Sequence, residues 1–146
     1  MGVVLVERHV PRPLDAVWAV VSDLAGHRVP LTVIDPDPGP TTVGWAFVAR
    51  TGLGLVRFAD RMVVTRWQPP TPAGTAEFAV VKTGRWLSGW AAVRLTAQDG
   101  GRATRLSWTE EIVPHPHAVG RLAAPLTDRA VRTIFRRAVA DLAARA

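Results

Sequence analysis

The sequence contains no cysteine and no tyrosine, and each absence removes a class of chemistry. Without cysteine there are no disulfides, no thiolate nucleophiles and no cysteine-ligated metal sites. Without tyrosine there is no phenolic acid or base. The lack of cysteine also fits a reducing compartment. Any chemistry of this chain therefore depends on carboxylates, histidines, hydroxyls and basic groups.

Long hydrophobic runs are missing as well. The apolar stretch that begins at Val3 is interrupted by Glu7 and Arg8, so it does not form a secretory signal. No apolar stretch approaches the ~20 residues that a membrane-spanning helix needs. Val6 stands where N-myristoylation requires serine or threonine. We therefore expect a soluble, cytoplasmic protein.

The size and composition indicate one globular domain. The chain has 146 residues, of which 48% are hydrophobic and 21% are charged, so we expect a single domain over residues 1–146. The formal net charge is +6 and is carried by arginine, except for the only lysine, Lys82. A basic surface can attract nucleic acid or anionic lipid. Because the arginines are spread along the chain, we expect no nucleic-acid partner.

The order of predicted elements is strand, short helix and then a series of strands. Residues 3–10 are predicted to form a strand that prolines end, and apolar residues recur at helical spacing over 14–24. The stretch 35–40 alternates aspartate and glycine with proline and is predicted to be a loop. Over 44–113, turn signals separate four or five strands, which sequential hairpins would join into an antiparallel meander.

A long amphipathic helix is predicted to close the chain. Thr127 and Asp128 offer an N-cap. After them, apolar residues that include Ile134 and Ala138 line one face, and arginines lie elsewhere around the axis. About twenty residues of helix would run ~30 Å, about the width of a small domain. This helix is therefore long enough to cover a sheet.

The last hairpin, residues 87–113, gives the most specific geometric prediction. With a two-residue turn at Gly100-Gly101, both strands agree on which face is buried. Glu110 then falls on the apolar face beside small residues, where a carboxylate needs a partner or solvent. Glu110 lies either at the rim of the sheet, hydrated or paired with an arginine, or inside a pocket as a polar anchor or acid/base. The predicted pairs are Leu95–Leu106, Val93–Trp108, Ala91–Glu110 and Gly89–Ile112.

Another strand, residues 56–67, places a second carboxylate on an apolar face. Phe58, Asp60 and Met62 share this face, which Arg66 ends. If the face points inward, Asp60 is a second polar group in an apolar wall. The two faces differ only modestly, so a β-bulge could exchange them.

Aromatic residues are the remaining candidates for a ligand-binding wall. Trp45 and Phe47 alternate on one predicted strand, and Trp108 lies on the last one. An aromatic wall suits a flat ring or an acyl chain. Ordinary core packing explains each of these side chains as well.

No motif for a nucleotide, a hydrolase or a metal is recognised. Gly52-Leu53-Gly54 lacks the third glycine and the following helix of a phosphate loop, and no serine has the context of a nucleophile elbow. His115-Pro116-His117 has no further ligands at useful spacing. We therefore expect neither a metal nor a nucleotide cofactor.

Three stretches, 10–23, 61–70 and 101–108, resemble the START-like (SRPBCC, helix-grip) superfamily. More narrowly, they are similar to the bacterial polyketide cyclase/dehydrase and lipid-transport families. The resemblance implies an α+β fold, in which a seven-stranded curved antiparallel sheet surrounds a long C-terminal helix, with two short helices after the first strand. It also implies a deep, mostly apolar cavity. Finally, it implies that the first strand pairs with the last, which would bring Arg8 or its neighbours near Glu110, where an inward Arg8 could pair with the carboxylate.

The superfamily has no single shared catalytic set, so the resemblance does not identify a reaction. The leading hypothesis is a binding module for a lipid, polyketide or aromatic compound, held between the sheet and the C-terminal helix. The alternative is a polyketide cyclase, aromatase or dehydrase, in which Glu110 or Asp60 moves protons. A third hypothesis places the arginine-rich helix on a membrane or nucleic acid, and a homodimer stays open. The predicted ligand contacts are Trp45, Phe47, Phe58, Asp60, Met62, Ala91, Trp108, Glu110, Ile134 and Ala138.

Overall fold

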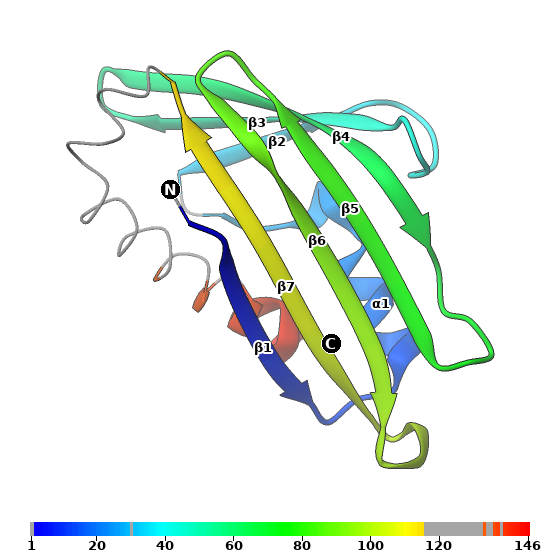
Figure 1. The fold of residues 1–146 in the computed structure, drawn as a ribbon. Coiled ribbons are helices and arrows are strands. Elements are labelled where there is room, and N and C mark those ends of the chain that lie inside the picture. Colours follow the sequence, from blue (N-terminus) through cyan, green and yellow to red (C-terminus); the bar gives the residue numbers. More distant parts are fainter. Residues whose placement is uncertain (1, 30, 116–132, 134–135, 138) are drawn as a thin grey trace.

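Seven strands form one curved antiparallel sheet in the computed structural model, which describes residues 2–29, 31–115, 133, 136–137 and 139–146. Their spatial order is β1-β7-β6-β5-β4-β3-β2, so the first and last strands are neighbours (Figure 1). This sheet confirms the predicted helix-grip architecture. The strands are β1 (Val4–Val10), β2 (Thr32–Pro36), β3 (Ala46–Leu53), β4 (Val56–Gln68), β5 (Thr75–Thr83), β6 (Leu87–Gln98) and β7 (Ala103–Pro114).

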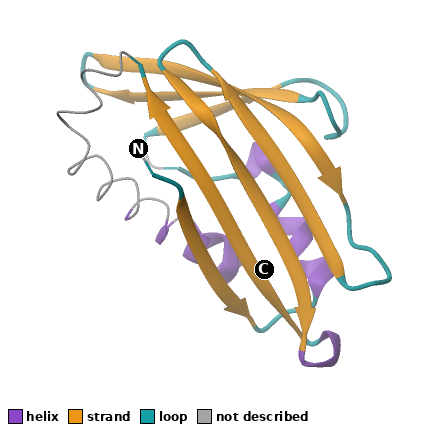
Figure 2. Cartoon of the chain, in the orientation of Figure 1, coloured by secondary structure: helices purple, strands orange, loops and turns teal. Residues whose placement is uncertain are grey.

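Apart from a short segment at the tip of the β6–β7 hairpin, the helices lie on one side of the sheet (Figure 2). Helix α1 (Leu14–Val21) contacts β5, β6 and β7, and it buries Leu14, Val17 and Val21. The helical spacing predicted over 14–24 is divided in the structure, because the α-helix stops at Val21 and a 3-10 turn, η1 (Leu24–Gly26), follows. These are the two short helices expected after the first strand. No helix among the described residues is long and apolar enough to cross a membrane.

The register of the last hairpin agrees with the sequence-based prediction. Ala91 pairs with Glu110 and Val93 pairs with Trp108 across β6 and β7. The ladder ends at Gln98 opposite Ala103, one pair before the predicted turn. The short segment η2 (Asp99–Gly101), whose residues all have positive φ, joins the two strands. Gly89 has a φ of +125°, and a Cβ there would collide with the carbonyl oxygen of Glu111, so only glycine fits this close approach.

Two local predictions were wrong. Asp35 and Pro36 belong to strand β2 and not to a loop. Strand β2 lies at the edge of the sheet, where a proline without an N–H does not interrupt pairing. In β4 the register shifts between Val64 and Arg66, so Trp67 turns to the concave face opposite Phe78. Arg66 turns to the outer face, because the bulge exchanges the two faces from that point.

The C-terminal segment is helical over residues 139–145. Val139 and Leu142 are buried there and belong to the same hydrophobic core as α1 and the central strands. The apolar side of this segment therefore packs inward, as predicted. The predicted N-cap at Thr127 and Asp128 lies outside the described residues.

Candidate functional site

Three ionisable side chains meet on the concave face of the sheet. The ammonium nitrogen of Lys82 lies 3.1 Å from Oε1 of Glu110 and 3.5 Å from Oδ2 of Asp60. Lys82 also donates toward the sulfur of Met62 at 3.7 Å. The three charged side chains are only 6%, 4% and 11% exposed for Lys82, Asp60 and Glu110. We refer to Asp60, Lys82 and Glu110 as the interior cluster.

The alternation of strand residues brings the interior cluster together. On β5 the buried positions are Ala76, Phe78, Val80 and Lys82, so the lysine continues an apolar row. Gly89 and Ala91 lie on β6, the strand between β5 and β7, opposite Lys82 and Glu110 respectively. These small residues leave room for the ammonium and the carboxylate to meet above β6. The space that the sequence predicted beside Glu110 is therefore bridged by an ion pair.

Burial disfavours the ionised form of the Asp60 carboxyl. Burial raises the pKa of Asp60, and Glu110 adds to the rise, whereas the charge and hydrogen bond of Lys82 oppose it. Its Oδ1 is buried and has no hydrogen-bond partner among the described residues. A Cβ on Gly84 would lie 2.6 Å from this oxygen, so the glycine lets the backbone approach the carboxylate. A buried carboxylate oxygen without a hydrogen-bond partner lowers the stability of the folded state, so its presence calls for an explanation such as a role in binding.

The partner of Glu110 was not the one expected. Strand β1 does pair with β7, as the resemblance implied, but Val4 stands opposite Glu110 and Arg8 stands opposite Leu106. Arg8 is exposed at the edge strand, four positions along β7 from Glu110. Lys82 was not among the site residues predicted from the sequence. The available signal was its position as the only lysine of the chain, in phase with three apolar residues.

Aromatic rings line the concave face next to the interior cluster. Trp18 of α1 packs against Trp67 and Phe78, with ring centroids 5.0 and 6.0 Å apart. Phe78 also meets Trp108 edge to face at 6.5 Å. Trp67, Phe78 and Trp108 come from β4, β5 and β7, and their ladder partners place them in one row across the sheet. This aromatic row is an apolar surface of the kind that suits a ring compound.

His27 borders the aromatic row and is held neutral. Its ring lies 6.0 Å from that of Trp108, and its Nε2 is 2.7 Å from the carbonyl oxygen of Val21. Burial lowers the pKa of His27, although the hydrogen bond to Val21 acts in the opposite direction. His27 therefore contacts the end of α1 by donating its Nε2–H to the carbonyl oxygen of Val21, and its lowered pKa favours the neutral ring.

The other predicted ligand contacts are distributed over several environments. Trp45 and Phe47 are buried in the core with ring centroids 5.7 Å apart. The indole of Trp45 donates to the carbonyl oxygen of Asp37, which ties the 37–40 segment to the sheet. Ala91 is buried beside the interior cluster. Ile134 and Ala138 lie outside the described residues.

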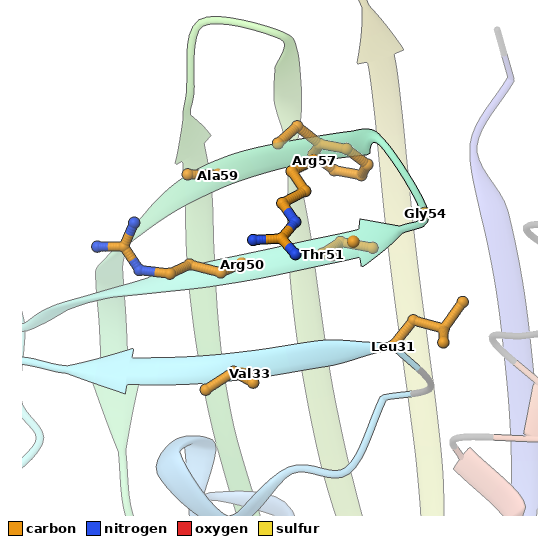
Figure 3. Close-up of a pocket in the computed structure, with 9 residues that line it drawn as sticks. Leu31, Val33, Arg50, Thr51, Gly54, Arg57 and Ala59 are labelled. Carbon is orange, nitrogen blue, oxygen red and sulfur yellow. The ribbon is translucent and has the colours of Figure 1, made fainter.

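Phe58 lies at a groove away from the interior cluster. This groove has a volume of about 570 Å³ and surrounds the far ends of β2, β3 and β4 (Figure 3). Arg50 and Arg57 extend into it from neighbouring strands, next to the exposed side chains of Leu31 and Val33. Arg50 alternates with the buried Ala49 along β3, so its guanidinium leaves the opposite face of the sheet from the interior cluster.

The interior cluster can bind a polar group or transfer a proton. It offers two carboxylates and one ammonium in a setting of low solvent exposure, where electrostatic interactions are strong. Among the described residues there is no group of three histidine, aspartate or glutamate side chains that could hold a metal ion. Two carboxylates beside an ammonium support hydrogen bonding and general acid–base catalysis.

Residues 1–146, the whole chain, match the family described as polyketide cyclase / dehydrase and lipid transport, and the chain belongs to this family. No curated protein sequence matches it significantly. Among solved structures, a protein from Thermus thermophilus is 13% identical with a TM-score of 0.76, covering 99% of this chain and 96% of that one.

Two further solved structures share the fold. Norcoclaurine synthase from Thalictrum flavum, a point mutant bound to a transition-state analogue, is 14% identical with a TM-score of 0.59, over 97% of this chain and 93% of that one. The di-domain ARO/CYC protein BexL, from the BE-7585A biosynthetic pathway, is 16% identical with a TM-score of 0.65. That match covers 99% of this chain and 46% of BexL. At these identities the likeness concerns the fold.

Proposed function

We propose that this chain is a single domain that binds a hydrophobic small molecule between the concave face of its sheet and its C-terminal helix. The observation that carries the proposal is the interior cluster, because it places Asp60, Lys82 and Glu110 on a face that is otherwise apolar. The aromatic row would hold the body of the ligand. The interior cluster would fix the orientation of its polar end.

The energetics of the interior cluster support a role in binding. Replacing a buried ion pair by apolar residues of similar volume is often neutral or stabilising, so such a group is weak evidence for a purely structural role. Asp60 in addition keeps one carboxylate oxygen without a partner among the described residues. A ligand that meets this need would recover part of the cost of burial.

The family and the neighbouring structures support the same function. The family description names cyclases, dehydrases and lipid transport, and one neighbour was solved with a transition-state analogue bound. These activities act on small molecules with large apolar parts. We further propose that the protein acts in the cytoplasm, without nucleic acid as a partner.

Native mass spectrometry of freshly purified protein tests the proposal. We expect a co-purified small molecule, or uptake of added aromatic and acyl compounds at one site per chain. Glu110→Gln should change the affinity or the bound species, whereas Glu77→Gln, a matched change on the outer face, should not. Protein that takes up no hydrophobic compound while correctly folded would contradict the proposal.

A cyclase or dehydrase is the second candidate function. The observation that favours it is the buried carboxyl of Asp60, whose raised pKa makes it a better proton acceptor than an ordinary aspartate. Lys82 would stabilise negative charge that develops on an enolate. Asp60→Asn or Glu110→Gln should then abolish turnover of a poly-ketone substrate and leave its binding intact. A carrier would lose binding and form no product with either variant.

A further inference from the structure

We propose that the interior site selects ligands whose polar group is a neutral or cationic hydrogen-bond donor, and that it rejects anionic ligands such as carboxylates. This inference rests on the proposed function and adds a substrate class to it. The geometry points to this class because, among the described residues, the ammonium of Lys82 is already surrounded by partners, whereas a carboxylate oxygen of Asp60 has none.

The donors of the interior cluster all belong to Lys82. An ammonium group has three N–H donors and no acceptor. Its three neighbours are Oε1 of Glu110 at 3.1 Å, Oδ2 of Asp60 at 3.5 Å and the sulfur of Met62 at 3.7 Å. Two of these contacts are ion pairs and the third is a hydrogen bond to the sulfur, so the oxygen of a ligand would compete with two carboxylates for the ammonium.

The acceptors of the interior cluster are not all used. Oδ1 of Asp60 has no hydrogen-bond partner among the described residues, and it lies against Gly84. Glu110 contacts Lys82 through Oε1, and its side chain is 11% exposed. Its second carboxylate oxygen makes no hydrogen bond within the described part of the chain. A hydroxyl, an ammonium or an amide N–H on the ligand can meet these oxygens.

The charge of the interior cluster leads to the same conclusion. Two carboxylates surround one ammonium, so with all three groups ionised the cluster carries one net negative charge. An anion brought to it in an environment of low dielectric is repelled, whereas a cation is attracted. His27, which borders the aromatic row at Trp108, donates to the carbonyl oxygen of Val21, and burial lowers its pKa. The lowered pKa disfavours a positive charge there that would compensate an anion.

A matched ligand series tests the inference on the full-length protein. The probes are 2-naphthylmethanol, 2-naphthylmethylamine and 2-naphthoate, which share the naphthyl ring system and differ in the polar group. Affinity is measured at pH 7.5 by calorimetry and by quenching of tryptophan fluorescence. We expect the alcohol and the amine to bind at least about 10-fold more tightly than the carboxylate, which corresponds to the effect of one hydrogen bond or one charge pair.

Two variants assign this order to the interior cluster. Asp60→Asn combined with Glu110→Gln leaves Lys82 as the only charge, so the carboxylate should become the tightest of the three ligands. Glu77→Gln removes a carboxylate on the outer face, paired there with two exposed guanidiniums, and should leave the order unchanged. The wild-type series decides the question by itself if the double variant does not fold.

The outcomes separate the inference from the proposed function. Equal or tighter binding of naphthoate by the wild-type protein overturns the inference, while the proposed function stands. If none of the three probes binds, and native mass spectrometry finds no bound small molecule, both are removed. Selective binding that the double variant leaves unchanged also overturns the inference, because another part of the protein would then discriminate.

Discussion

The interior cluster has a counterpart of opposite composition on the outer face of the same sheet. There, Glu77 of β5 lies between Arg66 of β4 and Arg94 of β6, with the closest nitrogen–oxygen distances at 2.8 and 3.3 Å. One anion stands between two cations outside, and one cation stands between two anions inside. The distances are similar, but the outer guanidiniums are 60% and 69% exposed and the interior groups are nearly enclosed.

This difference shows that solvent exposure, and not distance, decides the energetic weight of an ion pair. Water and salt screen the outer pairs, and their long side chains lose conformational freedom when they pair. The interior groups have lost their hydration, so each depends on its neighbours. Removing one member of each cluster should therefore have unequal effects, and the predictions below follow that order.

Lys82→Met should have the largest effect. The substitution keeps the length of the side chain but leaves Asp60 and Glu110 as two buried carboxylates without a cation. We expect it to lower the free energy of unfolding by about 3–5 kcal/mol, as measured by urea denaturation at pH 7.5. The triple variant Asp60→Asn, Lys82→Met, Glu110→Gln is the control and should recover most of the loss. A loss below about 1 kcal/mol for Lys82→Met alone would mean that the interior ion pairs contribute no more to stability than exposed pairs do, which would contradict the prediction.

Gly84→Ala should have the next largest effect, because it acts on the same carboxylate through packing. The added Cβ would lie 2.6 Å from Oδ1 of Asp60 and 3.2 Å from its Cα. We expect a loss of about 1–3 kcal/mol, which is typical of overpacking a closed site. Gly2→Ala is the matched control, since a Cβ there meets nothing within 4 Å. If both variants melt at the same temperature, the backbone of Gly84 does not enclose the cluster.

The pH dependence of stability should reveal another buried group, His27. Burial lowers the pKa of His27 below the 6.5 of an unfolded histidine, so the folded state binds fewer protons than the unfolded state. Stability should therefore be fully present above pH 6.5 and decline as the pH falls through that value toward the lowered pKa. Urea denaturation between pH 8 and pH 5 measures this slope, which His27→Gln should reduce. An unchanged slope would assign it to other histidines.

Glu77→Gln should have the smallest effect. The outer pairs are exposed, so we expect a loss below about 1 kcal/mol, which should shrink further when the salt concentration is raised to 1 M. The loss caused by Lys82→Met should change little with salt. If the two losses respond equally to salt, the contrast between the two faces of the sheet does not hold.

The sequence was sufficient to predict most of the sheet. In the last hairpin, each strand has one apolar and one polar face, and only one register places the two apolar faces on the same side. The predicted register was therefore confirmed, including Ala91 opposite Glu110. The edge strand β2 was missed, because its proline and aspartate are typical of loops and its pairing with β3 is a tertiary contact. The bulge after Val64 also could not be placed from sequence, since it exchanges two faces of similar polarity.

The site was only partly accessible from the sequence. Asp60 and Glu110 were identified because each interrupts an apolar face. Their partner Lys82 was missed, because strand order decides which residues meet and β5 is separated from β7 by a whole strand. The expectation of an arginine from β1 had the correct strand pair but the wrong register: the residue opposite Glu110 is Val4. Strand neighbours were therefore predictable, and diagonal contacts between side chains were not.

The pairing of β1 with β7 has a consequence for how the chain emerges from the ribosome. Val4 cannot meet Glu110 until β7 has been synthesised, and at about 5–20 residues per second the first strand waits on the order of 5–20 s for its neighbour. During that time β1 presents unsatisfied backbone groups, with the apolar run at residues 4–6 followed by the polar run at residues 7–9, open to pairing with other nascent chains. Its charged residues, Glu7 and Arg8, would act as gatekeepers against such association until β7 pairs with it.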